Sequence, residues 1–374
     1  MTRSLQVFII LMVHTYFCIL YLAFGIDSQE FAGGIIKFGF SAEEVHIILQ
    51  LSLLSITAII LAFLTPVKIV FKANIINRKR VQAGFYVFTI PLISFLFYKS
   101  AASGFNYGTL ATERHSYSFL VELRVIPYLL IIQHASQTYL RTSFWFKVLI
   151  FLSILVMIIY QARSIMLEII LIAMCIRLRQ TNDKFSVKYY VIGFLMIPLS
   201  NVMIALRNQL SFEQYLNDMF KFEYLLIFNN IVAASLSVNY EDKLGWVIER
   251  FVLILPSPLR NLFGLSNPSD QMFRDVTSAA SLTSGGFSYL ANSYIIFGYY
   301  TFLVLYILYF MIEIVRKNYM IYKINNYIAY SYPLLLSYVI LAIRNDMGVL
   351  FKQIIQIILI ATIMNMISRM RWKI

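Results

Sequence analysis

The chain has 374 residues, of which 60% are hydrophobic and 13% charged, and its formal net charge is +13 at pH 7. This composition excludes an ordinary soluble domain, in which about a quarter of the residues are charged. The basic residues stand in short clusters between apolar runs, which is typical of cytoplasmic loops and argues against nucleic-acid binding.

Apolar runs of about the length that crosses a bilayer recur along the whole sequence. The predicted spans are Leu5–Phe24, Val45–Leu64, Ala83–Tyr98, Tyr117–Gln133, Phe146–Gln161, Ile165–Ile176, Tyr189–Leu206, Phe287–Ile312, Tyr327–Ile343 and Val349–Ile367. We therefore expect an all-α fold, a polytopic transmembrane helical bundle of about ten spans, in which residues 1–374 form one integral membrane domain.

Basic residues are concentrated on one predicted side of this bundle. If Met1 lies in the cytoplasm, the segments on that side carry most of the Lys and Arg residues, and their acidic residues are Asp183 and Glu313. Short cytoplasmic loops have this bias. The sequence thus predicts that both termini are cytoplasmic.

One long segment, residues 207–287, is not plainly membrane-spanning, and the predicted topology places it on the outer, periplasmic side. It contains two short apolar pieces, residues 220–238 and 246–259. We expect these pieces to form short interfacial helices, although the sequence leaves open whether they enter the membrane. The segment ends in a run rich in Ser, Thr and Gly.

Basic residues also stand at tight turns on the outer side. They are Arg163, between the fifth and sixth spans, Arg207, at the start of the long segment, Arg344, between the last two spans, and Lys352, about two turns further on. An arginine at the end of a membrane helix is costly to desolvate unless an anion meets it, and guanidinium groups suit phosphate oxygens. The pattern predicts a site for an anionic, lipid-linked substrate. The alternative is a structural ion pair, such as Arg163 with Glu168.

Further titratable residues lie within or before the fourth span. Glu122 and Arg124 are spaced i,i+2 and do not face each other on a helix, so each needs a partner elsewhere, in an interhelical pair or a functional site. His115, in the preceding outer loop, is placed where an outward-facing base would be useful, with a solvated loop histidine as the alternative. Cys18 and Cys175 are interpreted as buried thiols.

The sequence contains no nucleotide-binding, hydrolase or metal-ligand motif of familiar spacing. We therefore predict neither a metal nor another cofactor. An enzyme of this kind would draw on an activated lipid-linked donor.

The end of the long segment carries a recognisable spacing. Arg274 is followed by ten residues and then Gly285, and this Arg-x10-Gly arrangement resembles the motif in the outer loops of Wzy-type O-antigen polymerases. The next span resembles the one that follows the large periplasmic loop of that family, because Tyr294 and Phe297-Gly298 match. Asn292 stands near the position where the family has an acidic residue. The architecture, with one large outer loop late in the sequence, is similar over nearly the whole chain.

This resemblance implies a fold like the GT-C glycosyltransferases and a metal-independent polymerase at the periplasmic face of the bacterial inner membrane. The growing glycan would pass from undecaprenyl diphosphate to the next lipid-linked repeat unit. The implied partners are this lipid-linked oligosaccharide, the bilayer and a chain-length regulator protein. The expected substrate-binding residues are Arg163, Arg207, Arg274, Gly285, Arg344 and Lys352. The expected catalytic residues, one of which would take the acceptor proton, are His115, Asp270 and Asp275.

Other functions fit the same composition. An O-antigen ligase has a similar architecture but uses lipid A core as the acceptor. A flippase or secondary transporter of lipid-linked oligosaccharide predicts broken helices, inverted repeats and charges along a central cavity. A scaffolding membrane protein would not need arginines in tight outer turns. The single dominant outer segment and the absence of a visible repeat favour an enzyme.

Overall fold

The computed structural model describes a little over half of the chain. The described residues are 28–31, 34–37, 42–72, 78–102, 124–136, 148, 151–152, 168–180, 191, 202, 211–218, 243–252, 254–255, 260, 262–264, 289–321, 326–341 and 347–369. Statements about contacts and absences below concern this part of the chain.

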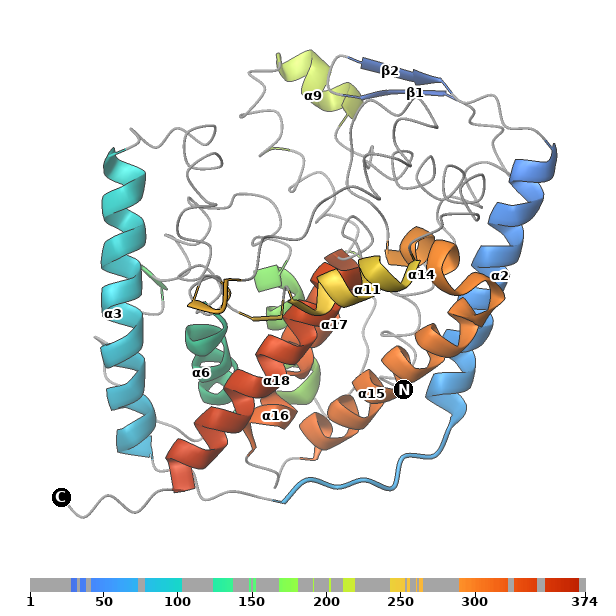
Figure 1. Ribbon diagram of the computed structural model, residues 1–374. Helices are drawn as coiled ribbons and strands as arrows, with labels where there is room; N and C mark the ends of the chain where they lie inside the picture. Colours follow the sequence, from blue (N-terminus) through green and yellow to red (C-terminus); the bar gives the residue numbers. More distant parts are fainter. Residues whose placement is uncertain are drawn as a thin grey trace. The chain divides into compact units, whose positions relative to one another are not determined.

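Helices make up nearly all of this part (Figure 1). They are α2 (Ala42–Leu64), α3 (Arg78–Ala102), α6 (Val125–Ser136), a helix that includes residues 168–180, α9 (Phe212–Asp218), α11 (Lys243–Val252), α14 (Tyr289–Phe297), η2 (Gly298–Tyr300), α15 (Thr301–Met320), α16 (Tyr327–Tyr330), α17 (Tyr332–Leu341) and α18 (Met347–Arg369). The strands β1 (Ser28–Phe31) and β2 (Gly34–Lys37) pair antiparallel.

The predicted helical class is confirmed for this part of the chain, apart from the β1–β2 hairpin, which the sequence did not predict. Seven of the predicted spans contain a described helix, the exceptions being the first, fifth and seventh, which fall wholly or almost wholly outside the described residues. In the described residues two helical runs, Tyr289–Met320 and Met347–Arg369, are long and apolar enough to cross a membrane. Other apolar helices, such as Val125–Ser136, are shorter. The full set of about ten spans stays a prediction.

The eighth predicted span is not one uniform helix. Gly298 has φ +55°, a left-handed conformation that a right-handed helix cannot continue through. The chain therefore turns between α14 and α15 (Figure 1). This gives the glycine of Phe297-Gly298 a structural role that spacing alone did not reveal.

The chain divides into two compact units. The first comprises Met1–Val67, Leu210–Glu313 and Tyr338–Ile354, and the second comprises Lys68–Gln209, Ile314–Ser337 and Ile355–Ile374. The three boundaries in the C-terminal region fall inside helices, so α15, α17 and α18 each contribute to both units.

In the first unit, α2, α14 and α15 are joined by hydroxyl and ring contacts. Thr65 Oγ1 lies 3.0 Å from Tyr306 Oη, and the Phe63 and Tyr309 rings are 6.5 Å apart. The hydroxyls of Tyr289 and Tyr309 are hydrogen-bonded at 2.7 Å, and both residues are almost fully buried. Paired hydroxyls leave neither oxygen unsatisfied, which is the condition for burying tyrosine in an apolar core.

In the second unit, α6 packs against α3 and α16. Asparagines link the elements further. Asn326 caps the start of α16, because its Oδ1 accepts a hydrogen bond from Ile328 N at 2.9 Å. Asn365 of α18 binds the same region twice, through Tyr327 N at 2.9 Å and Asn326 Oδ1 at 2.8 Å.

Candidate functional site

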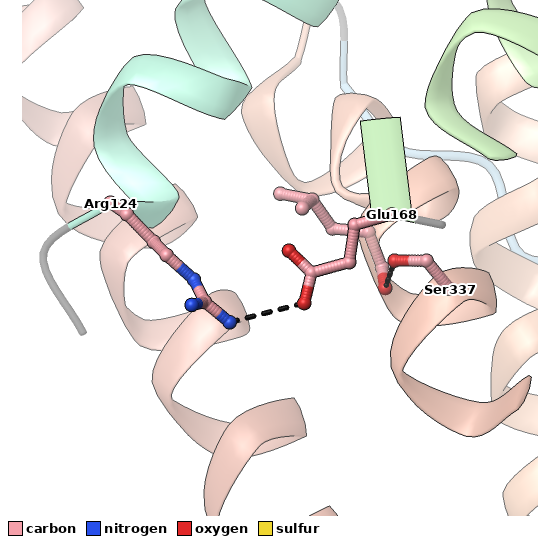
Figure 2. Close-up of polar contacts among 4 residues, drawn as sticks. Arg124, Glu168 and Ser337 are labelled. Atoms are coloured by element: carbon pink, nitrogen blue, oxygen red, sulfur yellow. Dashed lines mark hydrogen bonds and ion pairs between the residues drawn. The ribbon is translucent and has the colours of Figure 1, made fainter. Parts of the chain in front are cut away.

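Arg124 and Glu168 form a buried ion pair in the second unit. Arg124 Nη2 lies 3.0 Å from Glu168 Oε1, with side-chain exposures of 9% and 1%. Figure 2 shows the two side chains pointing toward one another, with Ser337 of α17 close by. The Ser337 hydroxyl donates a hydrogen bond to Leu334 O, within its own helix.

The sequence explains why this pair is needed. Arg124 directly precedes α6, in which most side chains are buried, and its carbonyl accepts a hydrogen bond from the amide of Tyr128 at the first turn. A guanidinium in that position requires a compensating charge. The prediction that Arg124 pairs with another helix is thus confirmed, while Glu122 lies outside the described residues. Glu168, which we considered as a partner for Arg163, contacts Arg124.

Arg179, further along the helix of residues 168–180, is a second buried cation, 1% exposed. Its guanidinium carbon lies 4.7 Å from the ring centroid of Tyr319 and 5.0 Å from that of Tyr330. Cation–π contacts of this kind offset part of the desolvation cost. Tyr319 Oη is in turn 3.1 Å from Ser136 Oγ. No local pattern predicts this packing, because the two tyrosines lie far from Arg179 in the chain.

In the first unit, α14 is fixed to the start of α18. Asn292 is 1% exposed, and its Oδ1 accepts a hydrogen bond from Met347 N at 2.9 Å. Ser293 Oγ donates to Met347 Sδ at 3.1 Å. Asn292 thereby satisfies one of the amides that a helix start leaves without an intrahelical acceptor. Its amide oxygen accepts this hydrogen bond as a carboxylate oxygen would, but an amide has no proton to exchange as an acid or base.

Lys352 is the one predicted site residue that the structure describes. It lies on α18, beyond the turn held by Asn292, and its side chain is half-buried. The other predicted site residues, which lie outside the described residues, are His115, Arg163, Arg207, Asp270, Arg274, Asp275, Gly285 and Arg344. Their convergence with Lys352 stays a prediction.

Two short helices of the long segment 207–287 are described. α9 begins with a capping box, because Ser211 Oγ accepts from Gln214 N at 3.2 Å and Gln214 Oε1 accepts from Ser211 N at 3.0 Å. α11 has 10 residues, too few to cross a bilayer. Short helices were predicted at residues 220–238 and 246–259. α11 overlaps the second of these pieces, α9 precedes the first, and residues 220–238 lie outside the described residues.

One face of α11 is apolar and exposed. Leu244, Ile248 and Phe251 follow the helical spacing i, i+4, i+7 and are 73%, 56% and 58% exposed. This pattern is typical of a helix that lies in the interface of a bilayer.

Comparison of the chain with protein-family models, with curated proteins and with solved structures gives no match.

Proposed function

We propose that this chain is a Wzy-type polymerase that joins lipid-linked polysaccharide repeat units at the periplasmic face of a bacterial inner membrane. The observation that carries the proposal is the single long polar segment of an otherwise apolar chain, ending in Arg274-x10-Gly285. Helices at seven of the predicted spans and an amphipathic helix, α11, within the polar segment support the architecture.

The architecture proposed here is a bundle of about ten spans with both termini in the cytoplasm. The two long apolar runs that end the chain, Tyr289–Met320 and Met347–Arg369, are its eighth and tenth spans. Arg344 falls in the outer turn before the tenth span, and Lys352 follows on that span.

In the proposed reaction, the acceptor hydroxyl attacks the anomeric carbon of the donor glycan, and undecaprenyl diphosphate leaves. The arginines stabilise the negative charge that develops on the diphosphate as the glycosidic bond breaks. One of His115, Asp270 and Asp275 takes the proton of the acceptor hydroxyl. The growing glycan is thereby transferred to the single repeat unit on the same type of lipid.

A polysaccharide gel tests this function. In a deletion strain complemented with Arg274→Ala or Arg344→Ala, we expect the ladder of long chains to be lost, because the leaving diphosphate loses charge stabilisation. Protein level and the glycan of a single repeat unit should persist. Arg371→Ala is the matched control, since it removes an arginine on the predicted cytoplasmic side and should keep the ladder.

An unchanged ladder in both variants would remove these arginines from the site. A deletion strain that lacks even the single capped unit would replace the polymerase by a ligase or a flippase.

One observation favours the flippase or transporter as a second candidate. The helical run from Tyr289 to Met320 is broken at Gly298, and the short helix before the break buries Asn292 and Ser293. Discontinuous helices with polar residues near the break are frequent at transporter binding sites. Every glycan that reaches the surface requires a flippase. Deletion of a flippase would therefore remove the band of the single repeat unit, whereas deletion of a polymerase would leave that band.

A further inference from the structure

Arg260 is a buried arginine that the proposed reaction does not use. It belongs to the long segment 207–287 and is 7% exposed. Its described neighbours Leu262 and Phe263 are 76% and 66% exposed. A charged side chain is thus buried beside apolar side chains that face outward, the reverse of the usual distribution.

Two nitrogens of the Arg260 guanidinium have no hydrogen-bond partner among the described residues. Within the described part of the chain, its Nε and Nη1 atoms are buried and donate no hydrogen bond. Arginine keeps its charge at any pH that a folded protein meets, and an unpaired buried charge costs several kcal/mol. Arg124 has a similar exposure, 8%, and there a carboxylate lies 3.0 Å away. In the same part of the chain, Nε and Nη1 of Arg179 likewise donate no hydrogen bond, but that guanidinium lies against the rings of Tyr319 and Tyr330. Among the described residues Arg260 has neither a carboxylate nor a ring contact of this kind, and this difference points to a ligand as its counter-ion.

We propose that Arg260 binds the phosphate group of a ligand. Guanidinium nitrogens donate charge-assisted hydrogen bonds to phosphate oxygens, and a phosphate brings both the charge and the acceptors that Nε and Nη1 lack. The same chemistry is offered by a lipid headgroup and by a soluble phosphate or diphosphate.

The neighbouring helix points to a lipid as the source. The exposed apolar residues of α11, Leu244, Ile248 and Phe251, lie in the same unit and shortly before Arg260 in the chain. Together with Leu262 and Phe263 they suit the acyl region just below the headgroups. The proposal does not depend on the polymerase reaction, since any phosphate-bearing lipid of the bilayer can supply the group.

Thermal unfolding of the purified full-length chain in an uncharged detergent tests the site. The probes are phosphatidylglycerol, diacylglycerol with the same acyl chains, and inorganic pyrophosphate. We expect phosphatidylglycerol to raise the Tm and diacylglycerol to leave it unchanged, because only the former carries phosphate. An equal rise with pyrophosphate would identify a soluble ligand. No rise with either phosphate compound would overturn the proposal.

Variants separate a binding role from a structural one. Arg260→Met should raise the Tm of the lipid-free protein, since it removes an uncompensated buried charge, and should abolish the response to phosphate.

Arg260→Lys keeps the charge but not the planar donors, and should weaken phosphate affinity about tenfold or more. Lys68→Gln, a change to an exposed lysine of the other unit, should keep the full response. A lower Tm for lipid-free Arg260→Met together with an undiminished response of Arg260→Lys would show that the protein itself satisfies Arg260.

Discussion

Buried arginines are the most informative single residues of this chain, because each must be compensated by a specific group. Arg124 is compensated by the carboxylate of Glu168, and Arg179 by the rings of Tyr319 and Tyr330. They stabilise helix packing, whereas Arg260 has no such compensation among the described residues.

The Arg124–Glu168 pair should behave as a coupled unit. Arg124→Met or Glu168→Leu alone leaves an uncompensated buried charge and is expected to lower the free energy of unfolding by about 3–5 kcal/mol. The double variant removes both charges and should recover most of that loss, which a double-mutant cycle of thermal or denaturant unfolding in detergent measures. Additive losses in the double variant would contradict the pairing.

Gly298 should be more sensitive to substitution than a glycine in a regular helix. Its φ of +55° costs any residue with a Cβ about 1–2 kcal/mol, so Gly298→Ala should destabilise the protein by that amount. An added Cβ meets nothing within 4 Å there, which leaves the backbone as the cause.

Gly84→Ala is the matched control for this effect. Gly84 lies inside α3 with no atom within 4 Å of an added Cβ, and alanine there should be neutral or stabilising by up to about 1 kcal/mol. Equal unfolding free energies for the two variants would argue against the left-handed conformation of Gly298.

At the scale of elements, side-chain amides hold an extended segment in place. Residues 66–72 follow α2 without forming a helix. Asn318 binds this segment twice, because Oδ1 accepts from Phe71 N at 2.6 Å and Nδ2 donates to Ile69 O at 3.0 Å. Asn326 Nδ2 adds a bond to Lys72 O at 3.1 Å. These bonds replace the partners that a helix or sheet would supply to the backbone.

Removal of Asn318 should release this segment. In Asn318→Leu the amide of Phe71 and the carbonyl of Ile69 lose their acceptor and donor, and local opening becomes easier. Lys68 and Lys72 are exposed, so trypsin should cleave after them several-fold faster than in the parent protein, as followed by mass spectrometry. Thr57→Val is the control, because Thr57 Oγ1 binds only a carbonyl of its own helix. Equal cleavage rates in parent and Asn318→Leu would rule out the amides as the restraint.

At the scale of the whole molecule, the distribution of charge predicts which segments face which side of the membrane. The segment with Lys68 is expected in the cytoplasm, and the segment with Glu213 in the periplasm. Both side chains are exposed, so both positions are accessible to a reagent on their own side.

Cysteine labelling tests this orientation. In a background without Cys18 and Cys175, Glu213→Cys should react with a membrane-impermeant maleimide in cells with a permeabilised outer membrane. Lys68→Cys should react only after the inner membrane is opened. Labelling of Lys68→Cys alone in the first condition would invert the topology.

The sequence by itself determined the helical class, the positions of most of the described helices and a short helix at the second apolar piece of the long segment. These depend on a local property, namely the length of the apolar runs. The sequence also required a distant partner for Arg124, because burying a charge needs one wherever it lies.

Only the tertiary structure decided which partners meet. Glu168 is 44 positions from Arg124, Met347 is 55 positions from Asn292, and Phe71 is 247 positions from Asn318. No spacing rule links positions so far apart, since their proximity follows from how whole helices pack. The burial of Arg260 also depends on tertiary packing. The one local indication of this burial is that leucines flank the arginine in Leu259-Arg260-Asn261-Leu262. Local patterns thus set the elements, and long-range packing determines which polar groups are satisfied within the protein.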